Sequence, residues 1–390
     1  MVATYRESLA MNRDILALDF YGKTIVAALA SHDEDTDTLR VRYVLQHHSD
    51  AFNGAFVRER SNAQDELTRV FAQISEYTER TPLVIVGVRG NFLSFRHGTG
   101  FTYTESRSRI IRESDIDNAI HEALPKELDD SLEVVDVLPL SYIIDDQPGA
   151  TDPVGMHGYC LGVETFVSYG VRTHLTNFKG VLGACGCEDF QWVPSSVALA
   201  EMALSSSEKI SSLLIDLGED STSAVLYHKN SLLEAWEIPF GLDRVAEGIA
   251  DQLQNDYPTA LEVLRNYEAD SVMDEVLLEA ALPVLQDIHK ELVQSLTYIQ
   301  HPPTQLVLCG QGAVPVLQKA LKNILGTRKA RLCTFNKLIS DCELSSPQYD
   351  GVLALLQYVV LREQNQVGIT QVKEEGLLGK LFGKLGFNLF

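Results

Sequence analysis

Residues 211–227 read SSLLIDLGEDSTSAVLY and decide the fold. This pattern predicts a buried β-strand that ends at Asp216, a turn, and a second strand that leaves through Val225. A strand, an acidic residue, a glycine-containing turn and a second strand can present backbone N–H groups and a carboxylate to a phosphate and its metal ion. The turn reads Gly218-Glu219-Asp220-Ser221 and carries two acidic residues. The functional question is therefore whether it still holds a phosphate.

The N-terminal part of the chain repeats this pattern. Residues 15–19 (ILALD) parallel residues 213–218 (LLIDLG), and in both places an Asp ends an apolar strand before a turn and a second strand. Such a repeat predicts two duplicated domains that face a cleft. Residues 305–313 (QLVLCGQGA) predict a third strand that enters a glycine-rich turn, followed by a helix over 314–325. A helix that begins at such a turn favours phosphate or ribose groups at its N-terminus.

Composition places the chain among soluble proteins of two or three domains. It has 390 residues, of which 45% are hydrophobic and 22% charged. The net charge of −22 argues against nucleic acid as a partner and means that an acidic membrane would repel the body of the protein. The six cysteines lack zinc-site spacing, which favours reduced thiols in a cytosolic chain. Residues 1–14 lack the apolar segment of a signal peptide, and no stretch approaches transmembrane length.

The middle of the chain has a different texture. Residues 91–104 are polar and strand-like, and a helix begins at Glu113. A strand over 132–138 and a Pro/Gly-rich loop over 147–158 follow. These residues predict a small α+β insertion.

These elements together resemble a known family. The two strand-Asp-turn-strand units and the late GQGA turn resemble the two phosphate loops and the adenosine loop of the actin-like ATPase fold. The segments RIIRESDIDNAIHEA and VVDVLPLSYIIDDQPGATDPVGMHGYCLGVETFV are similar to the inserted subdomain of the FtsA family of bacterial cell-division proteins. The type IV pilus protein PilM shares much of this architecture. The fold class implied is α/β and actin-like: two duplicated α/β domains around a cleft, an inserted α+β subdomain and a C-terminal amphipathic helix.

The resemblance implies a division of the chain into subdomains. They are subdomain 1A (12–88 and 170–207), inserted subdomain 1C (89–169), subdomain 2A (208–242 and 304–361), a reduced subdomain 2B (243–303), a linker (362–373) and a membrane-targeting helix (374–390).

The resemblance also implies a function. Members of the family lie on the cytoplasmic face of the inner membrane as peripheral proteins, polymerise there, and tether the FtsZ ring. The implied partners are the C-terminal tail of FtsZ on subdomain 2B, further copies of the chain, membrane lipids and later membrane proteins of the divisome. Between residues 267 and 305 the chain is shorter than in typical members, which predicts a reduced docking region for FtsZ.

The C-terminal residues 374–390 read EEGLLGKLFGKLGFNLF and follow a polar linker. Their apolar residues recur at helical spacing with lysines on the other side, which is typical of a helix lying in a membrane interface. The alternative is a helix packed on the protein's own core. The residues predicted to contact the membrane are Leu377, Leu378, Lys380, Leu381, Phe382, Lys384, Leu385, Leu389 and Phe390.

The cleft residues that the resemblance assigns to ATP and Mg²⁺, if these are bound, are Asp19, Gly22, Lys23, Asp216, Gly218, Ser221, Gly241, Gly310 and Gly312. The chain departs from the family at Tyr21, where a glycine is usual, and at Glu219 and Asp220, which replace two glycines. Carboxylates within a few ångströms of a triphosphate would repel it by several kcal/mol, and the loss of glycine limits close backbone approach. Leu261 and Glu262 stand where the family offers Glu and Lys to the ribose.

Three interpretations of function remain open at this point. The preferred one is an FtsA-type membrane tether with a diverged cleft, which either holds a nucleotide as a structural ligand or holds none, and hydrolyses ATP weakly at most. A second is a PilM-like scaffold for type IV pilus assembly. A third is an active ATPase or phosphotransferase of the same fold, although the sequence offers no catalytic residue or certain metal ligand for it.

Overall fold

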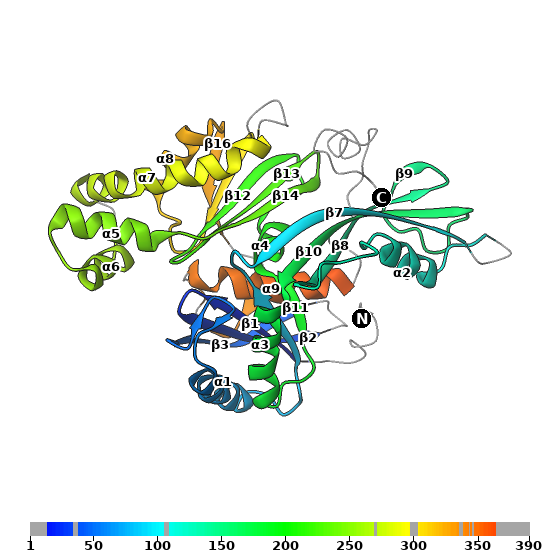
Figure 1. Ribbon diagram of the computed structural model, residues 1–390, viewed down its shortest axis with the longest axis horizontal. Helices are drawn as coiled ribbons and strands as arrows, with labels where there is room; N and C mark the ends of the chain where they lie inside the picture. Colours follow the sequence, from blue (N-terminus) through cyan, green and yellow to red (C-terminus); the bar gives the residue numbers. More distant parts are fainter. Residues whose placement is uncertain are drawn as a thin grey trace.

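The computed structural model describes residues 14–33, 38–104, 109–268, 271–296, 303–334, 338–342, 344 and 347–363. Two sheets lie one above the other and a third extends to one side, so that the molecule is elongated (Figure 1). Residues 364–373 of the predicted linker (362–373) and the predicted membrane helix over 374–390 lie outside the described residues.

The first sheet has six strands. Their order is β11 (Gln191–Pro194), β6 (Leu83–Val88), β1 (Asp14–Tyr21), β2 (Thr24–Asp33), β3 (Thr38–His48) and β17 (Ile339–Ser340). Alternate residues of β1 face opposite sides of the sheet. Leu16 and Leu18 pack toward helices α1 (Arg60–Ser75) and α3 (Arg172–Ala184), whereas Ile15 packs toward the centre of the molecule. A short hairpin of β4 (Phe52–Asn53) and β5 (Phe56–Val57) follows β3.

The second sheet repeats the order of the first. Its strands are β14 (Ser231–Ile238), β13 (Thr222–His228), β12 (Ser211–Leu217), β15 (Gln305–Cys309) and β16 (Lys329–Leu332). In each sheet the central strand, β1 or β12, is antiparallel to the strand that follows it and parallel to a later crossover strand, β6 or β15. Asp19 and Asp216 are each the sixth residue of their strand. The predicted duplication of two α/β domains is confirmed.

Two central helices join the sheets. They are α4 (Ser195–Ala203) and α9 (Asp350–Glu363), which pack on each other between the sheets, and α9 also contacts β1, β2 and β6. Most residues of both helices are buried, and α4 also buries the polar side chains of Ser195, Ser196 and Glu201. The remaining helices are α5 (Leu242–Leu253), α6 (Tyr257–Arg265), α7 (Ser271–Leu296), α8 (Pro315–Leu325) and the 3₁₀ turn η2 (Pro347–Tyr349).

The insertion forms the third sheet, at the side of the molecule in Figure 1. Its strands are β7 (Leu93–Tyr103), β10 (Cys160–Val171), β8 (Leu132–Ile144) and β9 (Gln147–Ala150), and α2 (Glu113–Glu122) packs on it. The predicted loop over 147–158 is wrong for its first four residues, which pair with β8 as β9. Asp145 and Asp146, with φ of 47° and 66°, close this hairpin in the left-handed conformation that a type I′ turn requires at both of its central residues.

Close packing of α2 on β7 makes Gly100 a sensitive position. A Cβ at Gly100 would lie 2.1 Å from the carbonyl oxygen of Ala119 and 2.3 Å from the amide nitrogen of Ala123, and backbone atoms cannot turn aside as a side chain can. We predict that Gly100→Ala destabilises the protein by about 1–3 kcal/mol, seen as a lower thermal unfolding midpoint.

Gly183→Ala is the matched control. Gly183 lies in α3, and a Cβ there meets nothing within 4 Å. Alanine should leave stability unchanged or raise it by up to about 1 kcal/mol. Equal midpoints for the two variants would contradict the packing described for α2.

Candidate functional site

The site lies where the two central sheets meet. The parallel strands β1 and β6 of the first sheet and β12 and β15 of the second end at the same edge, and ligands of open α/β sheets bind outside such carboxyl ends. The first predicted loop follows β1, the second follows β12, and the glycine-rich turn follows β15. The structure therefore brings the three predicted loops together.

Arg89 connects the two acidic residues of the predicted cleft. It directly follows β6, its Nη2 lies 2.6 Å from Oδ2 of Asp19, and its Nη1 lies 2.7 Å from Oδ2 of Asp216. All three side chains are at most 4% exposed. Burial alone would lower the pKa of Arg89, but the two carboxylates raise it above its ordinary value. A permanent cation of the protein thus occupies the position between the two acids.

Tyr21 fills the space beside this ion pair. Its hydroxyl donates to Oδ1 of Asp216 at 3.0 Å, and the guanidinium carbon of Arg89 lies 4.4 Å from the centre of its ring. Burial and the neighbouring Asp216 raise the pKa of Tyr21 well above its ordinary value, so the hydroxyl remains a donor. A Cβ at Gly310 would lie 2.4 Å from this hydroxyl, and one at Gly218 would lie 3.1 Å from it. Tyr21 therefore packs against both turns of the second domain.

Polar groups from α4 and β14 surround the same network. Ser195 donates to Oδ1 of Asp19 at 2.8 Å. Glu237 accepts hydrogen bonds from Ser196 at 2.8 Å, from Ser223 at 2.7 Å and from the backbone N–H of Gly90 at 3.1 Å. Burial raises the pKa of Glu237 to about 7, although these three donors and Arg89 oppose the shift.

The first residues of α9 pack against the ion pairs of Arg89. Burial, followed by the charge of Asp216, raises the pKa of Asp350 to about 7. A Cβ at Gly351 would lie 2.2 Å from Oδ2 of Asp19 and 2.9 Å from Nη2 of Arg89. The ion pair is therefore enclosed by backbone as well as by side chains.

The acidic residues of the second loop have different surroundings. Glu219 pairs with Arg265 of α6 at 2.9 Å, and its carbonyl oxygen accepts from the amide of Asp243 at the start of α5. Asp220 accepts from the hydroxyl of Ser221 at 3.2 Å, and burial raises its pKa above the ordinary value. Glu219 thus has an arginine partner, whereas Asp220 has the hydroxyl of Ser221. Because both positions carry side chains, the turn lacks the glycines that would let its backbone approach a phosphate closely.

The first loop has one residue that faces the cleft and one that does not. Gly22 has a φ of 55°, which a glycine adopts without strain, and a Cβ there would lie 3.5 Å from Oδ1 of Asp220. Lys23 points away, with its Nζ 3.2 Å from Oδ1 of Asp50 at the surface. The structure therefore separates Lys23 from the acids of the cleft.

The predicted glycines pack closely around the second loop. Gly218 donates its N–H to the carbonyl of Ser221 within the turn, at 3.0 Å. A Cβ at Gly241 would lie 2.3 Å from the carbonyl oxygen of Gly218, and one at Gly312 would lie 2.5 Å from the side chain of Leu217. These glycines are required for packing, whatever they bind.

The actin-like fold provides a nucleotide cleft, but the residues present do not fit Mg²⁺ between the two acids. Arg89 already pairs with Asp19 and Asp216, and Tyr21 stands beside them. Within the part of the chain that the structure describes, no group of three or more His, Cys, Asp or Glu side chains is arranged to hold a metal ion. Nucleotide binding by the predicted residues remains a prediction.

Sequence reasoning missed Arg89, Ser195 and Glu237 as members of this site. One signal was available for Arg89, since an arginine that directly follows the six-residue buried strand LVIVGV must find an anionic partner. Nothing local to Ser195 or Glu237 distinguishes them from other polar residues at element ends.

We predict that Arg89→Met strongly destabilises the protein, because it leaves two buried carboxylates without a cation. Breaking a buried ion pair in this way costs about 3–5 kcal/mol. Protonation removes the uncompensated charge, so the loss should be complete at neutral pH and shrink as the pH falls toward about 4. Chemical denaturation at several pH values measures both effects.

Arg40→Met serves as the control. Arg40 lies 3.7 Å from Asp341, with the two side chains 57% and 48% exposed, so the same substitution should cost no more than about 1 kcal/mol at any pH. A loss for Arg89→Met as small and as independent of pH as that of Arg40→Met would show that the buried ion pair is not needed.

Comparisons with known proteins show what this chain is similar to. The family model for the SHS2 domain inserted in FtsA matches residues 93–168. Cell division protein FtsA of Bacillus subtilis (strain 168) is 24% identical over 300 residues, covering 70% of this chain and 67% of that protein. FtsA of Streptococcus pneumoniae serotype 2 is 24% identical over 338 residues, covering 79% of this chain and 73% of that protein.

Solved structures share the fold at lower identity. A chain of a PilM–PilN type IV pilus biogenesis complex superposes with a TM-score of 0.61 at 17% identity, over 90% of this chain and 98% of that one. Ethanolamine utilization protein EutJ from Carboxydothermus hydrogenoformans gives a TM-score of 0.50 at 10% identity, over 92% and 94%. These likenesses concern the fold alone. The chain has the actin-like ATPase fold with an FtsA-type inserted SHS2 domain, and its predicted resemblance to the FtsA family is confirmed.

Proposed function

We propose that this chain is an FtsA-type cell-division protein that polymerises at the membrane and tethers the FtsZ ring, with a cleft closed by its own side chains. The relatives that cover most of its length are named cell division protein FtsA. The closed cleft is inferred from one observation, the position of Arg89 between Asp19 and Asp216. In this proposal the protein acts as a scaffold.

The closed cleft weighs against the alternative of an active ATPase or phosphotransferase. To bind Mg–ATP between the two acids, the chain would have to move Arg89 and Tyr21 out of a buried network. Separating charges that are paired at about 2.7 Å in a buried site is costly. Bound ATP and Mg²⁺ therefore remain the less favoured version of the proposal, with ATP hydrolysis weak at most.

The proposed membrane anchor is the segment 374–390. From residue 376 onward the chain has two lysines and no acidic residue, whereas the whole chain has a net charge of −22. A Leu/Phe stripe with local basic charge suits a helix in the plane of an anionic membrane surface. No helix in the described residues is long and apolar enough to cross a bilayer. We therefore propose a peripheral protein on the cytoplasmic face of the inner membrane.

Two exposed apolar surfaces support the proposed protein partners. In the region proposed as subdomain 2B, α5 to α7 expose Leu253, Tyr257, Val272, Leu282 and Val293, each at 39% or more. Solvent-exposed apolar residues gathered on a few helices are typical of a docking surface for a peptide. We propose this surface for the C-terminal tail of FtsZ.

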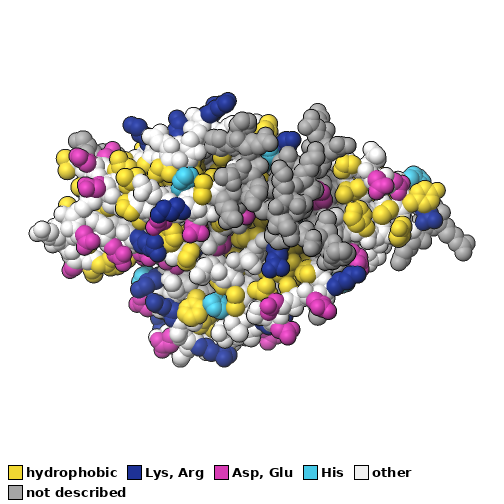
Figure 2. All heavy atoms as spheres, turned by 45° about the horizontal axis from the view of Figure 1, so that its top comes forward, with side chains coloured by type: hydrophobic (Ala, Val, Ile, Leu, Met, Phe, Trp, Pro, Cys, Tyr) yellow, Lys and Arg dark blue, Asp and Glu magenta, His cyan; other side chains and the backbone are white. Residues whose placement is uncertain are grey.

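The inserted domain carries the second surface. Hydrophobic side chains gather at the right-hand end of Figure 2, over the far end of β7 and β10. Phe101, Tyr103 and Tyr159 are 51%, 78% and 63% exposed there. We propose contacts of this surface with neighbouring copies of the chain and with later membrane proteins of the divisome.

The PilM-like alternative has the same fold but does not account for the amphipathic C-terminal segment 374–390. A scaffold for type IV pilus assembly would bind a short peptide from a partner and would need no basic amphipathic segment at its C-terminus. The fold likeness to a chain of the PilM–PilN complex does not choose between the two functions, because it is only 17% in sequence identity.

We predict that the full chain co-sediments with vesicles that contain anionic lipid, and that deletion of 376–390 abolishes this binding. Leu381→Glu/Leu385→Glu should weaken binding at least tenfold, since it places two charges on the apolar stripe. Gln366→Glu/Gln371→Glu adds the same charge in the linker and should bind nearly as well as the natural chain. If the deletion variant sediments with the vesicles as the natural chain does, the segment 374–390 is not the membrane anchor.

The same pellets separate the two scaffold functions. A labelled peptide of the FtsZ C-terminal tail should co-sediment only when the full chain is present. A labelled N-terminal peptide of a pilus assembly partner should stay in the supernatant. The reverse distribution of the two peptides would favour the PilM-like function.

We further predict no saturable binding of labelled ATP at micromolar concentration, with or without Mg²⁺, because Arg89 and Tyr21 occupy the cleft. Equilibrium dialysis of the natural chain measures this directly. An established actin-fold ATPase run in parallel shows that the assay detects binding. Micromolar affinity for ATP that depends on Mg²⁺ would contradict the inference that the cleft no longer binds nucleotide. It would not affect the proposed binding to the membrane.

A further inference from the structure

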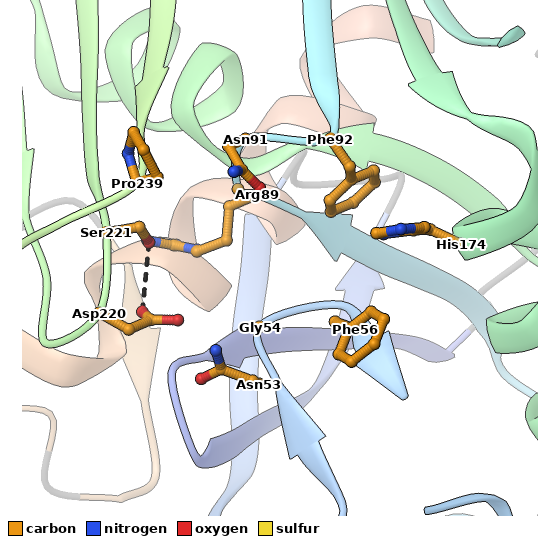
Figure 3. A pocket seen from close by; sticks show the side chains of 11 residues that line it. Asn53, Gly54, Phe56, Arg89, Asn91, Phe92, His174, Asp220, Ser221 and Pro239 are labelled. Carbon is orange, nitrogen blue, oxygen red and sulfur yellow. Dashed lines mark hydrogen bonds between the residues drawn. The ribbon is translucent and has the colours of Figure 1, made fainter. Parts of the chain in front are cut away.

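A cavity of about 290 Å³ opens beside the Arg89 network (Figure 3). Its walls come from the β4–β5 hairpin, the segment after β6, α3, the second loop and the segment after β14, so that both domains contribute to it. The volume is just below the usual range for ligand sites, which is roughly 300–1,000 Å³. The cavity is therefore suited to a ligand the size of one side chain.

One wall of the cavity is aromatic. The ring of His174 in α3 lies 5.2 Å from that of Phe56 and 5.4 Å from that of Phe92, measured between ring centres. Phe92 is buried, whereas Phe56 is 44% exposed at the cavity mouth. Nδ1 of His174 is buried and has no hydrogen-bond partner among the described residues. These rings offer a continuous surface to the body of a ligand.

The opposite wall is polar and acidic. In Figure 3, Asp220 and Ser221 lie across the opening from Phe56 and His174, and Asn53 lies below. Asp220 accepts the hydroxyl of Ser221 at 3.2 Å but makes no salt bridge with a described residue. The carboxylate of Asp220 is thus the charged group of this wall, and no described cation pairs with it in a salt bridge.

The charges around the cavity favour a cation. Arg89 lines the back, but Asp19 and Asp216 already neutralise it at 2.6 and 2.7 Å. Asp220 adds an acidic group to the lining of the cavity. A phosphate or carboxylate ligand would be repelled, whereas an ammonium or guanidinium group would be attracted to Asp220 and to the faces of the aromatic rings.

We propose that this cavity binds a small organic cation, with an ammonium or guanidinium group on Asp220 and its apolar body against Phe56, His174 and Phe92. The site is separate from the membrane anchor and from the proposed docking surfaces, and the proposal does not depend on them. The same cationic group could come from a free amine or from an arginine or lysine side chain of a peptide. The substitution of glycines by acids in the second loop would then have exchanged an anion site for a cation site.

Calorimetry with arginine amide as the probe tests this site. Citrulline amide has the same shape without the charge, and we expect it to bind at least tenfold more weakly. Asp220→Asn keeps the shape of the wall, removes its charge and should weaken the binding of arginine amide by a similar factor. Phe56→Ala should also weaken binding, whereas Tyr77→Ala should have no effect, because Tyr77 is similarly exposed, at 42%, but does not line the cavity.

The peptide Gly-Gly-Arg-Gly-Gly distinguishes the two sources of the cation. Tighter binding than arginine amide would assign the site to a partner's side chain, and weaker binding would assign it to a free amine. Thermal unfolding of each variant shows that it is folded. Equal binding of citrulline amide, full affinity in Asp220→Asn, or no saturable binding to the natural chain would each overturn the proposal.

Discussion

The structure depends on one buried ion pair network, in which Arg89 joins Asp19 of the first sheet to Asp216 of the second. Each of these charges would be costly in the interior by itself, and each is tolerated only because the others are present. The two domains therefore pack together through Arg89, which pairs with Asp19 of one domain and with Asp216 of the other. These are the two acids that the resemblance assigns to a ligand. This contact between the two domains is made by the protein's own side chains.

A second buried contact extends this rigidity to the insertion. Asp136 of β8 accepts from Nη1 of Arg362 at 2.7 and 2.6 Å and from the hydroxyl of Tyr358 at 3.2 Å. Both partners lie in α9, which also packs on the first sheet and on α4. The point from which the C-terminal segment departs is thus fixed to the insertion and to the central helices.

The acidic turn after β12 changes what the cleft can bind. A glycine in such a turn lets backbone N–H groups approach a phosphate, and an acid both blocks the approach and repels the ligand. Glu219 is neutralised by Arg265, whereas Asp220 faces a cavity with aromatic rings on its other side. The two neighbouring acids therefore have different surroundings, and only the folded chain separates them.

By itself the sequence determined the elements and their duplication. Apolar runs that end at Asp19 and Asp216, the buried strand LVIVGV and the helical spacing of the later segments are local patterns, and local patterns predict strands and helices well. The four-residue strand β9 was missed because so short a segment becomes a strand only by pairing with β8. The basic, apolar segment 374–390 is known from its sequence alone.

The tertiary structure decided the chemistry of the cleft. Arg89 is 70 residues from Asp19 and 127 from Asp216 in the chain, so no local pattern could show that it lies between them. The same holds for Tyr21 against Asp216 and for Asp220 opposite Phe56. Sequence periodicity reports which residues are buried, but electrostatic partners are set by which strand ends meet, and that is a property of the assembled sheets alone.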